Sequence, residues 1–254
     1  RASVFVGNTV ILFMGISLVL SVLLLFFVKP AVAVMSTPAE AVSGTAAYLT
    51  ICFLGIPFIT AYNVISSIFR GLGDSKSPMY FIAVACAVNI ILDYLFIGFF
   101  HLGASGAALG TTLSQACSVL FALIAIKRKQ TGLSLSGDCF RPQKKPLGKI
   151  LNIGIPVALQ DGFIQIAFII ITIIANRRGL NAAAAVGIVE KIISFLFLIP
   201  SSMLSTVSAL AAQNIGAGKY DRAKQTLRYA MMIAIGFGLV VSILIPFIAA
   251  PVVG

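Results

Sequence analysis

The chain has 254 residues, of which 59% are hydrophobic and only 10% carry a charge. Because soluble domains carry about 25% charged residues, this composition excludes an ordinary soluble protein. The net charge of +11 is of a size often seen in nucleic-acid-binding proteins, but the positions of the basic residues argue against that class.

Seven apolar stretches follow one another along the chain, and each is long enough to cross a membrane as a helix. About 20 apolar residues span a hydrocarbon layer of roughly 30 Å. In chain order the stretches are 2–28, 41–69, 77–100, 102–126, 150–176, 180–212 and 229–254. Runs of about 10 residues with alternating polarity, typical of a transmembrane barrel, are absent. The sequence therefore predicts an all-α, polytopic membrane protein.

The basic residues gather on one side of the predicted membrane. If successive helices alternate in direction, 14 of the 18 Lys and Arg residues fall in the loops of one side, seven of them within 127–149. Such a bias marks the cytoplasmic side, so segment 127–149 is predicted to be cytoplasmic. We expect a multi-pass protein of the plasma (inner) membrane, in contact with the lipid bilayer and with no nucleic-acid partner.

An internal repeat relates the two ends of the chain. Shifting the sequence by 221 residues places Arg1 on Arg222, Ser21 on Ser242 and other Gly and Pro residues on their equivalents. The repeat is typical of transporters with two parallel six-helix halves, so we expect an internal fragment of a twelve-helix protein. The predicted organisation is an N-terminal lobe at 1–130 with its last four helices, a cytoplasmic linker at 131–148, and a C-terminal lobe at 149–254 with its first three.

Asp93 is the most informative polar residue, because it lies inside the apolar stretch 77–100. A carboxylate in hydrocarbon costs about 2.5–3.5 kcal/mol on insertion scales. Asn89 precedes it by one helical turn and lies on the same helix face. An amide beside a carboxylate is a partial shell for Na⁺, which makes Asp93 a candidate metal ligand, and a carboxylate equally serves as a proton carrier. The alternative is a carboxylate paired for structure.

Polar residues in the fifth and sixth stretches form a second candidate group. They are expected to line a possible cavity of the second lobe and are Gln160, Asp161, Gln165, Glu190 and Lys191. The alternative for Asp161 is a structural ion pair with Lys191. A run of small residues, 103–110, is interpreted as a surface for close helix packing.

Motifs of soluble enzymes are missing from the chain. No complete phosphate-binding loop, G-x-S-x-G or H-E-x-x-H motif occurs, and His101 is the only histidine. The four cysteines have no spacing typical of a zinc site or a disulfide framework. We therefore expect no enzyme and no cofactor other than a coupling ion.

Five motifs resemble those of the multidrug and toxic compound extrusion (MATE) family. They are F-R-G-L-G-D-S-K-S-P at 69–78, N-I-I-L-D at 89–93, G-A-S-G-A-A-L-G-T at 103–111, G-I-P at 154–156 and A-Q-N-I-G-A-G-K at 212–219. The resemblance covers the whole chain and implies that its helices are the third to ninth of twelve.

The resemblance also implies a function and a set of site residues. Members of the family export drugs or organic cations by alternating access in exchange for Na⁺ or H⁺, and one chain with two lobes can work as a monomer. In one branch the coupling residues are similar to Asn63, Asn89, Asp93 and Thr111. A further acid of that branch lies on the first helix, outside this chain. Another branch uses a Glu on the seventh helix. In the corresponding helix of this chain the nearest acid is Asp161, which lies a few residues before the position of that Glu.

Other functions stay open at this point. The first alternative is a lipid-linked oligosaccharide or other lipid flippase of the same superfamily, which a cavity rich in Arg and Lys would favour. Only Lys191 lies deep in an apolar stretch, which favours a cationic substrate. A membrane-embedded enzyme and a non-transporting scaffold are further alternatives.

Overall fold

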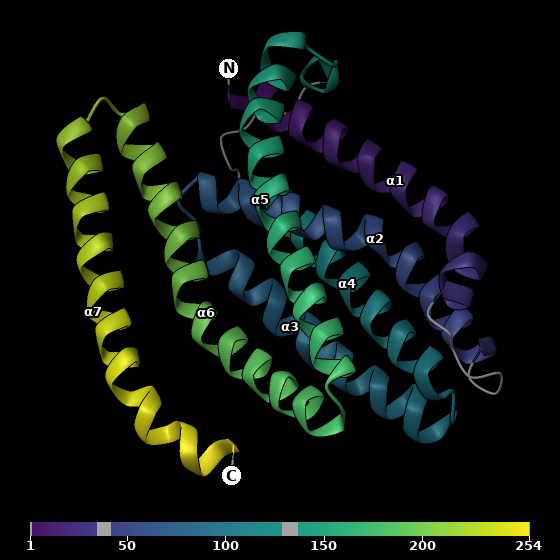
Figure 1. Ribbon diagram of the computed structural model, residues 1–254. Coiled ribbons are helices and arrows are strands. Elements are labelled where there is room, and N and C mark those ends of the chain that lie inside the picture. Colours follow the sequence, from purple (N-terminus) through teal and green to yellow (C-terminus); the bar gives the residue numbers. More distant parts are fainter. Residues whose placement is uncertain (1, 35–41, 129–136, 254) are drawn as a thin grey trace. The chain divides into compact units, whose positions relative to one another are not determined.

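The structure is a computed structural model that describes residues 2–34, 42–128 and 137–253. Over these ranges it is entirely helical, and seven helices are long and apolar enough to cross a membrane. They are α1 (Ala2–Val34), α2 (Val42–Gly71), α3 (Lys76–Asp93), α4 (Gly103–Arg128), α5 (Lys144–Arg177), α6 (Leu180–Gly216) and α7 (Tyr220–Val253), all labelled in Figure 1. The predicted all-α membrane fold with seven spans is confirmed.

Several helices extend beyond their predicted apolar stretches. Helix α5 begins at Lys144, inside the predicted linker, and α7 begins at Tyr220, nine residues before the apolar run. Basic residues in these extensions end the hydrophobic pattern without interrupting the helical backbone hydrogen bonds. Pro146 is tolerated in α5 because the first turn of a helix has no internal partners for its N–H groups. The predicted lobe boundaries at 130 and 149 stay a prediction.

Short helical segments flank two of the long helices. A π-helix, η1 (Tyr94–Phe99), continues directly from α3, and a 3₁₀ segment, η2 (Gly137–Phe140), precedes α5. The predicted span 77–100 is therefore α-helical only as far as Asp93.

The motif at 69–78 builds a tight turn between α2 and α3. Gly73 has φ 89°, and the Asp74 N–H donates to the Phe69 carbonyl at 2.9 Å, which is the glycine-dependent C-cap of a helix. The Asp74 carboxylate then accepts bonds from the Ser77 N–H and hydroxyl at 3.0 and 2.6 Å, which caps the first turn of α3. A similar turn with Gly218 at φ 72° ends α6.

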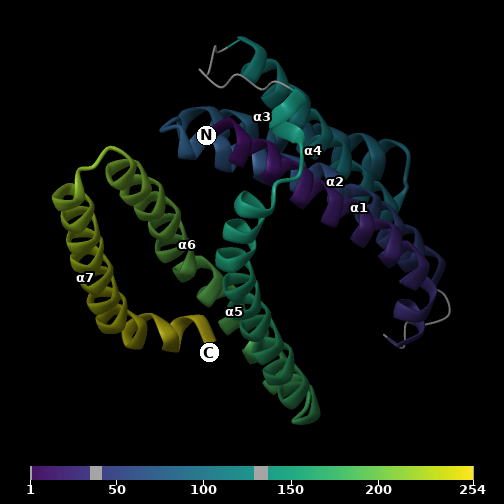
Figure 2. The same cartoon turned by 90° about the horizontal axis from the view of Figure 1, so that it is seen from above.

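The chain divides into two compact units, Arg1–Leu151 and Asn152–Gly254. In the first unit, α2 packs between α1 and α4, and α3 packs on α4 (Figures 1 and 2). Its core includes Phe69 and Phe81, whose rings meet edge-on at 5.5 Å, together with Tyr62, Ile65 and Ala122. In the second unit, α6 packs beside α7.

Hydroxyl groups link the helices of the first unit. The Ser21 hydroxyl of α1 donates to the Phe53 carbonyl of α2 at 2.6 Å, and the Ser118 hydroxyl of α4 donates to the Phe81 carbonyl of α3 at 3.1 Å. In hydrocarbon, helix association relies on close packing and such interhelical bonds rather than on the hydrophobic effect.

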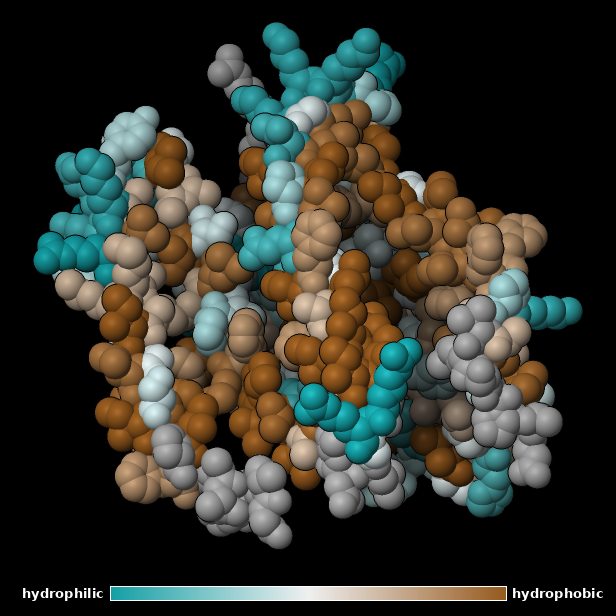
Figure 3. Space-filling view, viewed as in Figure 1, coloured by the Kyte–Doolittle hydropathy of each residue, from teal (hydrophilic) through white to brown (hydrophobic). Residues whose placement is uncertain are grey.

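Apolar side chains cover the flanks of the helices. Figure 3 shows brown, hydrophobic residues along the sides and teal, hydrophilic residues at helix ends. Large side chains such as Phe26 and Phe195 are 79% and 82% exposed. Contiguous apolar surface on this scale is unfavourable in water and favourable in hydrocarbon, so it agrees with a membrane environment.

The segment before α5 is held against α1 by Asn8, which is fully buried. The Asn8 amide donates to the Val4 carbonyl at 2.8 Å and to the Arg141 carbonyl at 3.3 Å. Its side-chain oxygen accepts the Gln143 N–H at 2.7 Å. One side chain thus satisfies three backbone groups, two of them more than 130 residues away in sequence.

Gly7 allows the backbone of α1 to approach the segment before α5 closely. A Cβ atom at Gly7 would overlap the carbonyl of Cys139, which is itself buried. The absence of a side chain at Gly7 and the amide at Asn8 therefore fix segment 139–143 on the first unit.

We predict that Asn8→Ala destabilises the full-length protein. The substitution removes the acceptor of the part-buried Gln143 N–H and the donor to the Arg141 carbonyl, which costs about 1–3 kcal/mol. Thermal unfolding of the purified protein in detergent should show a lower midpoint.

Asn214→Ala is the matched control. The Asn214 amide donates to the Leu210 carbonyl of its own helix at 2.8 Å, as Asn8 does to Val4, but Asn214 is only half-buried and its bond is exposed to solvent. Its loss should change stability by no more than about 0.5 kcal/mol. Equal effects of the two substitutions would contradict a special role of Asn8.

Candidate functional site

Asn89 and Asp93 meet on one face of α3. The Asn89 amide donates to a carboxylate oxygen of Asp93 at 3.4 Å, and both side chains are half-buried. This distance is long for such a bond, so the interaction is weak. Asn89 is the one hydrogen-bond partner of Asp93 in the part of the chain that the structure describes, and no basic side chain there forms an ion pair with it. The carboxylate keeps most of its capacity to accept further ligands.

The α-helix changes its winding immediately after Asp93. Within and after η1, the Phe100 N–H donates to the Leu95 carbonyl at 3.0 Å and the Leu102 N–H to the Phe96 carbonyl at 2.9 Å. These bonds span five and six residues instead of four. Wider turns of this kind occur frequently at functional sites, because they re-aim the side chains beside them.

Helix α4 approaches the Asp93 carboxylate through Gly110. A Cβ atom at Gly110 would overlap a carboxylate oxygen of Asp93 and would lie 3.5 Å from the Asn89 amide nitrogen. The run 103–110, interpreted from the sequence as a packing surface, thus also brings the backbone of α4 against the carboxylate.

A cavity of about 240 Å³ lies beside Asn89, between α2, α3 and α4, and Asp93 adjoins it through Asn89 without lining it. Its apolar lining comes from Ile82, Ala85 and Cys86. Its polar lining consists of Tyr62, Asn89, Thr111, Ser114, Gln115 and Ser118. Hydroxyl and amide oxygens next to a carboxylate are suitable ligands for a hard cation or partners for water.

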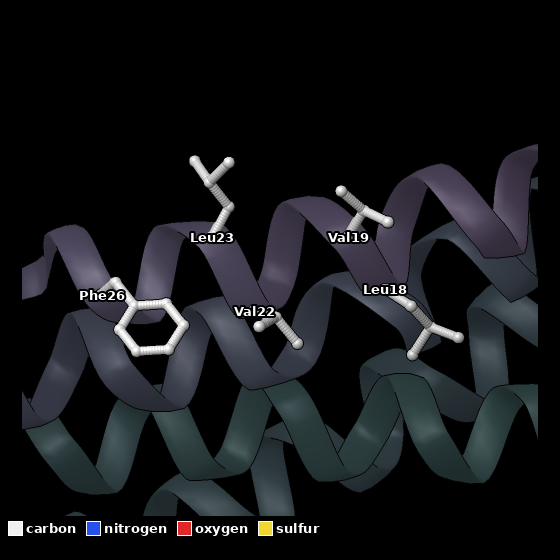
Figure 4. Close-up of a pocket in the computed structure, with 5 residues that line it drawn as sticks. All are labelled: Leu18, Val19, Val22, Leu23 and Phe26. Carbon is white, nitrogen blue, oxygen red and sulfur yellow. The ribbon is translucent and has the colours of Figure 1, made fainter.

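A larger hollow of about 470 Å³ has a different character. Figure 4 shows it on the surface of α1, where it is lined only by apolar side chains. These are Leu18, Val19, Val22, Leu23 and Phe26. With no polar atom to bind an ion, this surface suits hydrocarbon rather than a charged ligand.

The structure brings together three of the four residues predicted for the first site. Asn89 contacts Asp93, and Thr111 follows Gly110 and shares the cavity lining with Asn89. Asn63 is exposed, donates to the Ile59 carbonyl of its own helix at 2.9 Å, and is outside that lining. Its neighbour Tyr62 lies on the cavity instead.

Sequence reasoning missed several polar residues of the cavity. Ser114 and Ser118 are one helical turn apart on α4, as are Thr111 and Gln115. Polar pairs with this spacing inside an apolar stretch are a usable signal, because they share one helix face.

The five residues predicted for the second lobe lie on α5 and α6. Glu190 is half-buried, and its carboxylate lies 2.9 Å from the Thr172 hydroxyl. Gln160, Asp161, Gln165 and Lys191 are exposed. No ion pair joins Asp161 to Lys191 within the described residues.

A pocket in the second unit has other lining residues. It has a volume of about 400 Å³, lies between α6 and α7, and includes Ser202, Thr206 and Tyr229. The predicted cavity around Asp161 and Glu190 therefore stays a prediction.

Comparison with known proteins identifies the family. The MatE family model matches residues 1–95 and 156–253, which is well over half of the chain. The chain belongs to the MatE family. The resemblance seen in the five sequence motifs is confirmed, and with it a multi-pass membrane protein.

Two relatives show how much of a MatE protein this chain represents. It is 30% identical over 252 residues to the probable multidrug resistance protein YoeA of Bacillus subtilis, covering 96% of this chain and 54% of the relative. It is 30% identical over 235 residues to the multidrug export protein MepA of Staphylococcus aureus, covering 92% and 52%. The chain spans about half the length of the curated relatives it matches.

Solved structures of MATE transporters share the fold. An outward-facing multidrug resistance MATE transporter aligns with a TM-score of 0.86 and 25% identity, over 99% of this chain and 56% of that protein. An inward-facing structure aligns with a TM-score of 0.68 and 23% identity, over 99% and 62%. Structures with this fold are thus known in an outward-facing and in an inward-facing conformation.

The geometry predicts that Asn89 contributes more to ion binding than Asn63. Asn89→Ala removes a group that contacts the Asp93 carboxylate, whereas Asn63→Ala removes an amide bonded to its own helix. Because the Asn89 amide oxygen is a suitable cation ligand beside the carboxylate, Asn89→Ala should weaken apparent Na⁺ affinity about tenfold, which is about 1.4 kcal/mol. Asn63→Ala should change it less than about twofold.

The measurement is the rise in unfolding temperature of the purified full-length protein with increasing Na⁺ and, separately, with falling pH. If Asn63→Ala weakens the ion response as much as Asn89→Ala does, the ranking is wrong and Asn63 joins the site in another conformation.

Proposed function

We propose that the full-length protein is a cation-coupled antiporter that exports drugs or organic cations across the plasma membrane by alternating access. Membership of the MatE family supports transport rather than enzymatic catalysis. The relatives named above are multidrug proteins, which supports drug-like substrates. The coupling ion is Na⁺ or H⁺, since a carboxylate binds both.

The observation that carries this proposal is the state of Asp93. Its carboxylate lies on a membrane-spanning segment, contacts Asn89, which lines a cavity with polar side chains, and has a single weak hydrogen bond and no basic partner among the described residues. An ionised carboxylate without compensation is strongly unfavourable in a low-dielectric environment. A metal cation or a proton that binds Asp93 neutralises its charge and removes this energetic penalty. The removal of the penalty favours ion binding.

Each residue of the site has a distinct role in the proposed mechanism. Asp93 supplies the charge that the ion neutralises, and Asn89 contacts that carboxylate and contributes an amide oxygen. Thr111 adds a hydroxyl oxygen at the same cavity. Asn63 and an acid on the first helix of the full-length protein complete the set that the family resemblance implies.

Transport follows from a difference in ion affinity between two states. If the ion binds one lobe arrangement more tightly, it shifts the population toward that arrangement by its differential affinity. A drug that binds the other arrangement more tightly is then linked to the ion with the same coupling free energy in both directions. Entry of the ion is thereby coupled to export of the drug.

The remaining parts of the proposal concern organisation. The segment 127–149 lies in the cytoplasm, and the two lobes of one chain make a working monomer. Gln160, Asp161, Gln165, Glu190 and Lys191 contribute to a cavity of the second lobe. No feature of the described residues favours the flippase alternative.

Asp93→Asn tests the proposal directly. The substitution keeps the shape of the side chain and removes the charge, so ion-driven efflux should be lost while expression is retained. Full-length protein in proteoliposomes is assayed for drug efflux under a Na⁺ gradient and, separately, under a pH gradient. The gradient that drives efflux in the unmodified protein identifies the coupling ion.

Asp221→Asn is the matched control, because Asp221 is exposed in the first turn of α7, outside the apolar run. It should retain efflux, and Asp161→Asn measures the contribution of the second lobe. Undiminished ion-driven efflux with Asp93→Asn rejects Asp93 as the coupling residue.

A further inference from the structure

We propose that Gly110 is a positioning residue for the coupling carboxylate, because its missing side chain leaves the space that Asp93 occupies. The proposal rests on the proposed function of Asp93. It concerns a second helix, since Gly110 lies on α4 and Asp93 at the end of α3.

The space at Gly110 is taken by the carboxylate itself. A Cβ atom there would overlap an Asp93 carboxylate oxygen and would lie in ordinary contact, at 3.5 Å, with the Asn89 amide nitrogen. Gly110 is buried, so a methyl group has no route away from this contact. Any residue other than glycine at position 110 requires the carboxylate to move.

Other interactions hold the carboxylate only weakly. The Asn89 bond is 3.4 Å long, and Asp93 stands where the α-helical winding ends and the wider turns of η1 begin. Packing against the α4 backbone therefore restricts the Asp93 side chain more than its one hydrogen bond does. If the carboxylate moved, it would lose its contact with Asn89 and its position near the cavity that Asn89 and Thr111 line.

Gly106 shows that the effect is specific to one turn of α4. A Cβ atom at Gly106 would lie 3.1 Å from each of its three nearest atoms, which belong to Phe96 and Leu102 and not to a carboxylate. Gly106 is also buried and also packs against the end of the α3–η1 helix. Gly106→Ala is therefore a matched control for the packing cost of an added methyl group.

The first experiment compares Gly110→Ala with Gly106→Ala in full-length protein in proteoliposomes. We expect Gly110→Ala to raise the ion concentration for half-maximal drug efflux about tenfold or more, within the usual range of coupling between linked sites. Drug binding in the absence of the ion should be unchanged, whereas displacement of bound drug by the ion should be lost. Gly106→Ala should shift neither measurement more than about twofold.

The second experiment measures thermal stability and needs no transport. Gly110→Ala should lower the unfolding temperature in the unmodified protein but much less in an Asp93→Ala background, where the carboxylate is absent. Such non-additivity reports a direct contact between the two positions. This experiment remains informative if Gly110→Ala alone is too unstable to reconstitute. In that case the double variant, Gly110→Ala with Asp93→Ala, is expected to recover expression.

Three outcomes overturn the proposal. The first is a Gly110→Ala protein with an unchanged ion response, and the second is an equal loss with Gly106→Ala, which would indicate general packing. The third is equal destabilisation with and without the Asp93 carboxylate. If Asp93→Asn itself retains ion-driven efflux, the proposed function fails first and the role of Gly110 fails with it, which separates the two failures.

Discussion

A carboxylate that lies within a membrane-spanning segment with little compensation is the constraint on which the other features of the first unit depend. Asp93 has one long hydrogen bond from Asn89 and no basic partner in the described ranges. In hydrocarbon, such a group is tolerated only beside a polar cavity or a bound cation. The cavity lined by Asn89, Thr111 and four other polar side chains meets this requirement.

The helices around the carboxylate are shaped to admit it. Gly110 lets the α4 backbone approach within contact of Asp93, and the α-helical winding of α3 ends at that residue. Hydroxyl-to-carbonyl bonds such as that of Ser118 to Phe81 link the helices without using charge. The result is a largely apolar helical frame around one carboxylate, and neutralisation of that carboxylate would change the energy of the site.

Within the first unit, α1 also holds the segment that leads into α5. Asn8 and Gly7 of α1 bind segment 139–143, immediately before α5 begins at Lys144. The beginning of α5 is therefore fixed to α1 within the first unit.

Local sequence patterns determined the number and approximate ends of the membrane helices, since a run of 20 apolar residues spans a bilayer whatever it packs against. They also placed Asn89 and Asp93 on one face, because helical periodicity relates residues four apart. The five motifs were sufficient to recognise the family, which the MatE family model confirms. Asn63 shows the limit of this reasoning, because its residue type fitted the site while its side chain bonds to its own helix.

Only the tertiary structure decided which side chains share a cavity with that pair. Tyr62 and Ser118 reach the cavity from other helices, Gly110 approaches the carboxylate from α4, and Asn8 meets its partners across more than 130 residues. The change of winding at Asp93 likewise has no sequence pattern that predicted it. Contacts between helices depend on their register and separation, which are set by packing of the whole unit and not by the order of residues within any one helix.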